Sequence, residues 1–271
     1  MRILTFNLRT SYARGDGADH WERRKEIAAQ TILDIDPDIC GLQEMDPGMW
    51  ADLEPPLNPW RVIKGMAQSG SHENGNGLLI RKSAYQVEAS GQFWLSDTPD
   101  FESITFKHDW GPRIVLWARI SGKPSPKGRG EGEGRLREAG RSNPFIIAVT
   151  HFDTNPESWL PASRVCLREL GKIAGEPPLF LMGDFNSPAG SPAWKTLERS
   201  GFRDAWTELK KPEGAGIFTF HSFRGEDKNA DGRIDWILHR GPWKAESSAI
   251  DKRNREGAYP SDHFPVYADY R

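Results

Sequence analysis

Polar side chains that could carry out catalysis follow apolar stretches of this sequence in six places. Each place has a carboxylate, an amide or an imidazole directly after a run of residues that is typical of a buried strand. A rigid scaffold can present such groups to a shared pocket at the ends of its strands. The residues are Asn7, Glu44, His151 with Asp153, Asp184 with Asn186, Asp235, and Asp262 with His263. We therefore expect these side chains to meet in one site.

The residue types in this set favour one kind of chemistry. Carboxylate and amide oxygens without thiolates suit Mg²⁺ or Mn²⁺ better than structural zinc. Such an ion binds through one or two carboxylates together with phosphate oxygens of a substrate. The set therefore predicts metal-assisted attack of water on phosphorus.

Each signal taken alone has a simpler explanation. Gly183-Asp-Phe-Asn186 is also a common turn sequence, because Asp and Asn close Asx-turns. His151 alone is compatible with a satisfied core histidine. Ser261-Asp-His263 and Glu44 are compatible with helix caps or turns. The number and order of the six signals favour the shared site over these separate explanations.

The apolar patterns predict a mixed set of strands and helices that position these groups. Strands are expected at 2–8, 39–42, 179–182, 233–239 and 264–270. The stretches 77–81 and 85–94 are expected to pair with each other, and so are 114–120 and 145–151. Helices are expected at 21–33, 49–53, 157–174 and 192–200. Strands outnumber helices, and hairpins alternate with crossovers, which indicates an α/β domain.

The segment 121–144 interrupts this pattern because it is rich in Gly and charged residues and has almost no apolar content. Its six basic and three acidic residues are typical of a solvated insertion within a hairpin. A phosphate-binding arm is the alternative. No repeat and no boundary between two cores is visible, so residues 1–271 are expected to form a single domain with a flexible insertion at 121–144.

The composition excludes several classes of protein. The chain has 271 residues, of which 37% are hydrophobic and 27% charged, as in globular domains. A net charge of −2 argues against a protein that coats long stretches of nucleic acid. Cys40 and Cys166 lie in apolar stretches, which favours buried thiols over a disulfide scaffold. Without a transmembrane run or a signal sequence, the expected location is the cytoplasm, with no obligate protein partner.

The six signals belong to longer motifs that together cover essentially the whole chain outside 121–144. They are Thr5-Phe-Asn-Leu8, Pro37-Asp-Ile-Cys-Gly-Leu-Gln-Glu44, Thr150-His-Phe-Asp153, Gly183-Asp-Phe-Asn186, Arg233-Ile-Asp-Trp-Ile237 and Ser261-Asp-His-Phe-Pro265. This combination resembles the endonuclease/exonuclease/phosphatase superfamily, which has the DNase-I-like fold. The resemblance implies an α/β, four-layer α-β-β-α sandwich of two packed mixed β-sheets flanked by helices, with the site at one end.

The resemblance also implies roles on the metal side of the site. Glu44 resembles the principal metal carboxylate of the family, and Asn7 its neighbour on metal or phosphate. Asp262 resembles a second carboxylate on the metal side. Asp184 resembles the group that orients or deprotonates the attacking water, and Asn186 the group that positions that water or the phosphate. The expected cofactor is accordingly Mg²⁺ or Mn²⁺.

Further roles concern the phosphate. His263 with Asp235 resembles the His–Asp pair of the family, in which the carboxylate favours an imidazolium that stabilises phosphoryl charge. His151 resembles the phosphate-contacting histidine of many members. Asp153, on the same strand end, is expected to face the substrate. Arg113 is expected either to clamp phosphate with two parallel hydrogen bonds or to be a surface arginine of a strand.

Three further segments resemble a bacterial branch of hydrolases within this superfamily. They are Trp21-Glu-Arg-Arg24, Phe93-Trp-Leu-Ser-Asp-Thr-Pro99 and Thr219-Phe-His221. Trp94, His221 and Phe223 either flank the pocket or pack within the fold. Of these, His221 is taken as a candidate substrate-binding residue.

The segment 227–235 imitates the first nine positions of an EF-hand calcium loop. It has Asp227, Asn229 and Asp231 at positions 1, 3 and 5 and Gly232 at position 6. Leu238 stands where the loop needs a Glu, and a strand is expected to follow. A structural Ca²⁺ and a polar hairpin turn both remain as interpretations.

Three function classes compete. The favoured one is a divalent-metal-dependent phosphoesterase that hydrolyses a phosphodiester or phosphomonoester on a small or lipid-like substrate. The alternative is a Mg²⁺-dependent nuclease acting on DNA or RNA, which should carry basic loops for successive phosphates. A binding protein that has lost catalysis is disfavoured, because each matched motif position holds a chemically competent residue.

Overall fold

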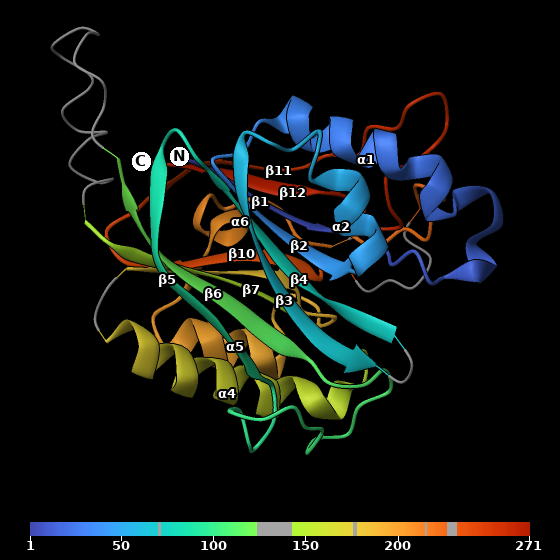
Figure 1. The fold of residues 1–271 in the computed structure, drawn as a ribbon. Helices are drawn as coiled ribbons and strands as arrows, with labels where there is room; N and C mark the ends of the chain where they lie inside the picture. Colours follow the sequence, from blue (N-terminus) through green and yellow to red (C-terminus); the bar gives the residue numbers. More distant parts are fainter. Residues whose placement is uncertain (70–71, 124–142, 176–177, 215, 227–231) are drawn as a thin grey trace, which may run out of the picture.

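The computed structural model describes residues 1–69, 72–123, 143–175, 178–214, 216–226 and 232–271. Within these residues, two mixed sheets pack face to face and helices cover both outer surfaces (Figure 1). This is the four-layer α/β sandwich that the family resemblance implies. Residues 124–142 of the predicted insertion and 227–231 of the candidate calcium loop lie outside the described residues.

The first sheet carries the N-terminal and C-terminal strands. Its order is β11 (Ala245–Ile250), β12 (Val266–Tyr270), β1 (Arg2–Asn7), β2 (Ile39–Met45), β4 (His72–Arg81) and β3 (Trp60–Ser69). β1 and β2 are parallel, whereas β12 and β4 run antiparallel to them on either side. The parallel pair is central and buried, as expected for strands made of continuous apolar residues.

The second sheet carries the middle of the chain. Its order is β5 (Tyr85–Trp94), β6 (Ile114–Gly122), β7 (Phe145–His151), β8 (Leu179–Asp184), β10 (Asp235–Arg240) and β9 (Arg203–Asp204). Here β7 and β8 form the central parallel pair, and β6 and β10 run antiparallel beside them. The two sheets therefore repeat one arrangement, with a parallel pair between antiparallel neighbours.

The helices begin at residues whose sequence signals are plain. α2 (Pro47–Leu53), α4 (Pro156–Ala174) and α5 (Pro192–Arg199) each start with Pro after a polar residue that accepts a backbone N–H. These N-cap residues are Asp46, Asn155 and Ser191. α1 (Trp21–Ile35), the short α6 (Ala205–Glu208) and a 3-10 segment, η1 (Arg14–Asp19), complete the set. Among the described residues, none of the helices has the length and apolar character needed to cross a membrane.

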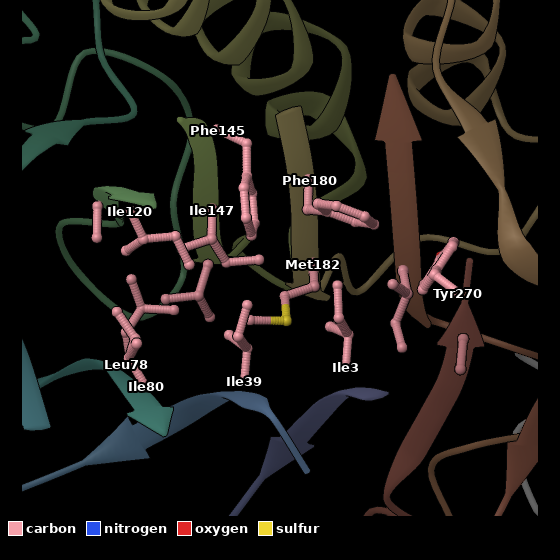
Figure 2. Packing of buried hydrophobic residues seen from close by; sticks show 14 of the residues in the cluster. Ile3, Ile39, Leu78, Ile80, Ile120, Phe145, Ile147, Phe180, Met182 and Tyr270 are labelled. Carbon is pink, nitrogen blue, oxygen red and sulfur yellow. The ribbon is translucent and has the colours of Figure 1, made fainter. Parts of the chain in front are cut away.

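Three apolar clusters hold the four layers together. One lies between the two sheets, where Ile3 and Ile39 of the first sheet face Met182 and Phe180 of the second (Figure 2). A second joins α1 and α2 to the outer face of the first sheet, and a third joins α4 and α5 to the second sheet. Because burial of apolar surface is the main stabilising contribution, the inter-sheet cluster fixes the two sheets against each other.

One expectation about strand pairing was wrong, and some strands were not predicted. The stretches 77–81 and 85–94 do not pair with each other: β4 pairs with β2 and β3, whereas β5 pairs with β6 in the other sheet. The three-residue connection between them crosses from one sheet to the other, and the buried Tyr85 contributes to the inter-sheet cluster. β3 and β11 were not predicted, because their alternation of apolar and polar residues is weak.

Strand direction gathers the polar residues at one end of the sandwich. The parallel pairs β1–β2 and β7–β8 end there, at Asn7, Glu44, His151 and Asp184. The antiparallel neighbours begin there, so Arg113 precedes β6, Asp235 opens β10 and His263 precedes β12. The topology therefore explains why residues far apart in sequence converge.

Candidate active site

The carboxylate of Asp184 is the meeting point of the site. Its Oδ2 accepts a hydrogen bond of 2.9 Å from Nδ2 of Asn7. The same oxygen lies 3.4 Å from Nε2 of His151 and 3.6 Å from Nε2 of His263. Asn7 and His263 come from the first sheet, and Asp184 and His151 from the second. Side chains from both halves of the sandwich therefore lie close to one buried carboxylate oxygen.

The residues around Asp184 hold it at the end of β8. Gly183 has φ of 150°, and a Cβ there would lie 1.9 Å from the carbonyl oxygen of Thr150, so this position of the strand needs glycine. The backbone N–H of Asn186 donates to Asp184 Oδ1 at 2.8 Å. Asn186 itself has φ of 48°, which Asn tolerates, and its Nδ2 donates to the carbonyl of Phe152.

Glu44 sits in an irregular part of β2. The pairing of β2 with β4 shifts between Leu42 and Met45, and Glu44 has φ of 60°. A non-glycine residue in this region costs backbone energy, and such strain is concentrated at functional sites. Its carboxylate accepts from Asn7 Nδ2 at 3.1 Å and from the backbone N–H of Thr10 at 3.0 Å. The irregularity therefore holds the Glu44 side chain beside Asn7.

Asp262 lies on the same side of the cavity as Glu44. Its Oδ2 is 3.6 Å from Nε of Arg9. Ser261, which precedes it, donates from its hydroxyl to the backbone carbonyl of Asn7 at 2.7 Å. Burial, opposed by His263 and reinforced by the charge of Glu44, raises the pKa of Asp262. Two carboxylates that repel each other across a buried space form a surface suited to a cation.

His263 and Asp235 form the expected pair. Nδ1 of His263 lies 2.9 Å from Oδ2 of Asp235, and both residues are buried. Burial alone would lower the pKa of His263, but the charges of Asp235 and Asp184 outweigh it and raise that pKa to about 10. The geometry favours an imidazolium whose Nε2 points toward Asp184.

Burial and nearby charges also shift the pKa values of the residues around His263. Burial and the charge of Asp235 raise the pKa of Asp184 to about 7. Burial and the positive charges of Arg113 and His263 hold the pKa of His151 well below its usual value. His151 is therefore neutral, and Nη1 of Arg113 lies 3.1 Å from its Nδ1.

Arg113 was expected either to clamp phosphate or to be a surface arginine of a strand. The structure places its side chain at the site. Its side chain lines the cavity, contacts His151 and forms an ion pair of 3.3 Å with Asp153. Asp153 was expected to face the substrate. Instead its buried carboxylate lies behind the cavity wall, where it holds Arg113 and the backbone N–H groups of Asp109 and Trp110. Asp235 likewise lies behind the wall, bound to His263.

A cavity of about 750 Å³ opens over these groups, a size typical of small-molecule sites. Seven of the predicted residues contribute to its wall: Glu44, Arg113, His151, Asp184, Asn186, Asp262 and His263. Asn7 lies directly beneath Glu44 and Asp184, to which it donates. The sequence prediction of one shared site is therefore matched by the arrangement of these side chains.

His221 is not brought to the cavity. Its ring stacks on Phe264 at 3.8 Å between centroids and lies edge-on to Tyr259. Burial and the charge of His263 lower the pKa of His221 to about 3, so the ring is neutral. Its Nδ1 accepts from the backbone N–H of Gly225. The structure thus supports the packing interpretation of this segment over the substrate-binding one.

Sequence reasoning missed the role of Arg24. This buried guanidinium on α1 donates to the backbone carbonyls of Leu8, Arg9 and Pro260. The first two follow Asn7, and Pro260 precedes the Ser261–His263 segment, so Arg24 fastens two loops of the site together. The Trp21-Glu-Arg-Arg24 motif was the signal. The role of Arg24 could not be predicted from this motif, because its hydrogen-bond acceptors are backbone carbonyls and no pattern of side chains indicates them.

Three other cavity residues were also missed: Arg9, Trp110 and Trp159. Arg9 stands two residues after Asn7, so its place after a strand end was a usable signal. Trp110 lies in an irregular segment and Trp159 in a helix, and neither position is marked by a catalytic motif.

Comparison with known proteins agrees with this architecture. The family model described as Endonuclease/Exonuclease/phosphatase family matches residues 4–263. The protein named Nocturnin from Drosophila melanogaster is 24% identical over 321 residues, an alignment that covers 100% of this chain. The chain spans only 46% of the length of that relative.

Solved structures show the same fold. The endonuclease/exonuclease/phosphatase from Bacteroides vulgatus superposes with a TM-score of 0.82 at 27% identity, covering 100% of this chain and 98% of that one. A mannosyl-6-phosphatase from Bacteroides thetaiotaomicron superposes with a TM-score of 0.81 at 22% identity, covering 100% and 99%. At that identity the second likeness concerns the fold alone.

Proposed function

Because this chain belongs to the endonuclease/exonuclease/phosphatase family, we propose that it is a divalent-metal-dependent phosphoesterase acting on a small substrate through an activated water. The observation that carries the proposal is the convergence of His151, His263 and Asn7 on one oxygen of Asp184. That oxygen lies at the wall of a cavity large enough for a phosphate ester.

The donor set fits a divalent cation. Glu44 and Asp262 supply carboxylate oxygens on one side of the cavity, with Asn7 between Glu44 and Asp184. Oδ1 of Asp235 is buried without a hydrogen-bond partner among the described residues, so one carboxylate oxygen next to the site is still open to a further partner. Oxygen ligands of this kind suit Mg²⁺ or Mn²⁺. When bound, the ion would neutralise phosphate charge and polarise the phosphorus–oxygen bonds.

Asp184 and Asn186 are the residues placed to act on the attacking water. Asp184 lines the cavity, and its carboxylate can accept a proton from a water that lies within hydrogen-bond reach. Asn186 is fixed through its backbone to Asp184 and through its Nδ2 to Phe152, so its Oδ1 can accept a second hydrogen bond. Together the two residues would orient the water toward phosphorus.

His263 and Arg113 are the residues placed to stabilise the phosphoryl oxygens. Asp235 accepts from Nδ1 of His263, which leaves Nε2 to donate into the cavity. Arg113, held by Asp153, also lines the cavity and can donate into it. Donors fixed in advance around a developing negative charge lower the barrier more than donors that must reorganise. His151, which is neutral, would add a hydrogen bond.

The charges around the cavity favour a single phosphate ester over a polynucleotide. Among the described residues that line it, Arg9 and Arg113 are the cations with a permanent charge. A nuclease needs further positive side chains along the path of successive phosphates. Nuclease activity on DNA or RNA is the alternative function that the experiment must separate.

The test is an assay of metal-dependent hydrolysis. The protein, dialysed against EDTA, is supplied with bis-p-nitrophenyl phosphate, p-nitrophenyl phosphate, or single- and double-stranded DNA and RNA. Each substrate is tested with no added metal, with Mg²⁺ and with Mn²⁺. We expect release of p-nitrophenol from an aryl ester only when metal is present, and slower or no cleavage of the polynucleotides.

Two outcomes would contradict the proposal. An unchanged rate in excess chelator would exclude the metal-dependent mechanism. Rapid cleavage of a polynucleotide with no hydrolysis of either aryl ester would identify a nuclease instead.

A further inference from the structure

The cavity is larger than a phosphate group. Besides the proposed catalytic residues, it is lined by aromatic and short polar side chains. The rings are those of Tyr12, Trp110, Trp159 and Phe220, and the polar side chains include Asn74 and Thr154. Side chains of this kind can receive the organic group of a phosphate ester.

Trp110 is the most unusual member of this wall. Its side chain is 65% exposed although it is one of the largest apolar residues of the chain. Because Trp110 also lines the cavity, its ring can offer a ligand a large apolar face of fixed geometry.

The backbone beneath Trp110 is organised by one buried carboxylate. Asp153, 1% exposed, accepts the backbone N–H of Asp109 at 2.8 Å and that of Trp110 at 3.2 Å. The backbone carbonyl of Asp153 accepts the indole N–H of Trp159 at 2.8 Å. One residue therefore fixes both tryptophans that line the cavity.

Additional hydrogen bonds fasten the segment 108–113 to the start of α4. Thr154 and Asn155 donate to the carboxylate of Asp109 at 3.3 and 3.1 Å. Nδ1 of His108 lies 2.8 Å from the carbonyl oxygen of Gly111. A segment held in this way presents Trp110 in a defined position, which reduces the entropic cost of binding a ligand against it.

Asp153 also links this wall to the phosphate end of the site. Its Oδ2 lies 3.3 Å from Nε of Arg113, whose Nη1 contacts His151. The two tryptophans and the guanidinium of Arg113 are therefore positioned by the same residue, Asp153. A substrate that reaches Arg113 with its phosphate would lie against Trp110 and Trp159 with its organic group.

We propose that Trp110 and Trp159, which we call the aromatic wall, bind the organic part of the substrate and that this part is a neutral, hydroxyl-bearing ring such as a pyranose. The proposal rests on the phosphoesterase function proposed above. The apolar face of a sugar ring packs on an aromatic ring, while its hydroxyls need donors and acceptors beside that ring. The side-chain amide of Asn74 and the hydroxyl of Thr154 line the same cavity and can supply them.

Other organic groups fit the same wall less well. An acyl chain would need a continuous apolar groove, whereas polar side chains interrupt this surface. A longer nucleic acid would need cations beyond Arg9 and Arg113, the two with a permanent charge among the described residues that line the cavity. The experiment below includes representatives of these other substrate classes.

The first experiment compares two substrates that differ in the ring. The kcat/KM values for D-glucose 6-phosphate and for glycerol 1-phosphate are measured with the parent protein and with Trp110→Ala. If only diesters are hydrolysed, the methyl diesters of the same two compounds are used. We expect Trp110→Ala to lower kcat/KM about tenfold for the sugar ester, mainly through KM, and less than about twofold for the glycerol ester.

The chain offers a matched control in Phe101→Ala. Phe101 is 71% exposed and belongs to the same irregular stretch, but it does not line the cavity. It should leave both substrates unchanged. An equal loss for both substrates in Trp110→Ala, or a Trp110 dependence seen only with adenosine 5′-monophosphate or a short-chain phosphatidic acid, would overturn the assignment of a sugar ring.

The second experiment separates this proposal from the function on which it rests. Saturation-transfer NMR of D-glucose 6-phosphate is recorded in EDTA, where turnover plays no part. Saturation of the ring protons should be strong with the parent and Phe101→Ala and at least about threefold weaker with Trp110→Ala. Equal saturation with all three proteins rejects the aromatic wall. Trp110-dependent binding without hydrolysis of any ester would instead reject the phosphoesterase function.

Discussion

Asp184 shows how much of the proposed chemistry depends on a single side chain. Its carboxylate is buried among Asn7, His151 and His263, and its second oxygen is held by the backbone of Asn186. Each of these groups donates a hydrogen bond to the carboxylate or lies close enough to act on its charge. A change at this residue should therefore affect catalysis far more than folding.

We expect Asp184→Asn and His263→Gln each to lower kcat about a hundredfold or more, because each removes a proton acceptor or donor at the reacting phosphate. The measurement is the metal-dependent rate on an aryl phosphate ester, together with thermal unfolding. Asp100→Asn, which changes an exposed carboxylate outside the cavity, serves as the control. A folded Asp184→Asn protein with nearly parental kcat would show that its assigned role is wrong.

Arg24 leads to a different expectation, because it acts on backbone atoms. Arg24→Met would leave the carbonyls of Leu8, Arg9 and Pro260 without their donor in a buried place. The free energy of unfolding should fall by about 3 kcal/mol, measured by urea denaturation. kcat should also fall, because Asn7 and the Ser261–His263 segment would lose their common support.

Arg24→Lys is the informative companion variant. It keeps the charge but not the planar fork that reaches several carbonyls. We expect it to recover only part of the stability and of kcat. Full recovery would mean that the charge of Arg24 matters and its geometry does not.

At this scale the sequence was most informative where side-chain chemistry follows a strand. Glu44, Asp184 and His263 were predicted because their types and positions carry a chemical meaning. For His221 the sequence left substrate binding and packing open, because a histidine near motif residues looks the same whether it faces the cavity or, as here, packs on Phe264. The role proposed for Trp110 could not be predicted, since it depends on backbone contacts made by Asp153.

At the level of elements, the ends of the central strands determine the site. β7 and β8 run parallel and end at His151 and Asp184, which lie opposite each other in the register. Gly183 is the residue that permits this close approach, because a Cβ there would collide with the carbonyl of Thr150. The pairing of two strands is thus directly coupled to the distance between two site residues.

Gly183→Ala should therefore lower both the melting temperature and kcat. The added Cβ forces β7 and β8 apart next to the site, and we expect a cost of about 2 kcal/mol or more. Gly171→Ala is the control, because a Cβ added at this position of α4 would lie in open space and alanine favours helix. Gly171→Ala should leave kcat unchanged and raise stability slightly; a neutral Gly183→Ala would contradict the role of that glycine.

Most elements could be predicted because their sequences satisfy local rules. The proline-initiated helices and the buried parallel strands carry strong signals of capping and apolar pattern. Pairing partners are a different matter. β4 and β5 are neighbours in sequence and were expected to form a hairpin, but partner choice depends on which sheet can bury each strand, and this is a property of the whole fold.

At the scale of the whole molecule, the position of the predicted insertion is informative. β6 ends at Gly122 and β7 begins at Phe145, and these ends lie opposite the site end of the same strands, with Ile120 facing Phe145. The site residues Arg113 and His151 stand at the other ends. The connection between β6 and β7 therefore departs from the sandwich far from the reacting groups.

Replacing residues 124–142 by a four-residue Gly/Ser linker should leave kcat and KM on small esters within about twofold, because the register of β6 and β7 already brings their ends together. Melting temperature and steady-state kinetics provide the measurement. A large loss of activity in a protein that keeps its melting temperature would support the phosphate-binding arm considered for this segment.

The inter-sheet cluster has a consequence beyond stability. Glu44 and Asn7 belong to one sheet and Asp184 to the other, so the thickness of the apolar layer sets how far apart the metal side and the water side of the site can be. Gly41 of β2 makes that layer thin, since a Cβ there would lie 2.6 Å from the terminal methyl of Met182. Small changes of side-chain volume between the two sheets would therefore alter the distance between Glu44 and Asp184. The reaction rate would change although no residue of the site is replaced.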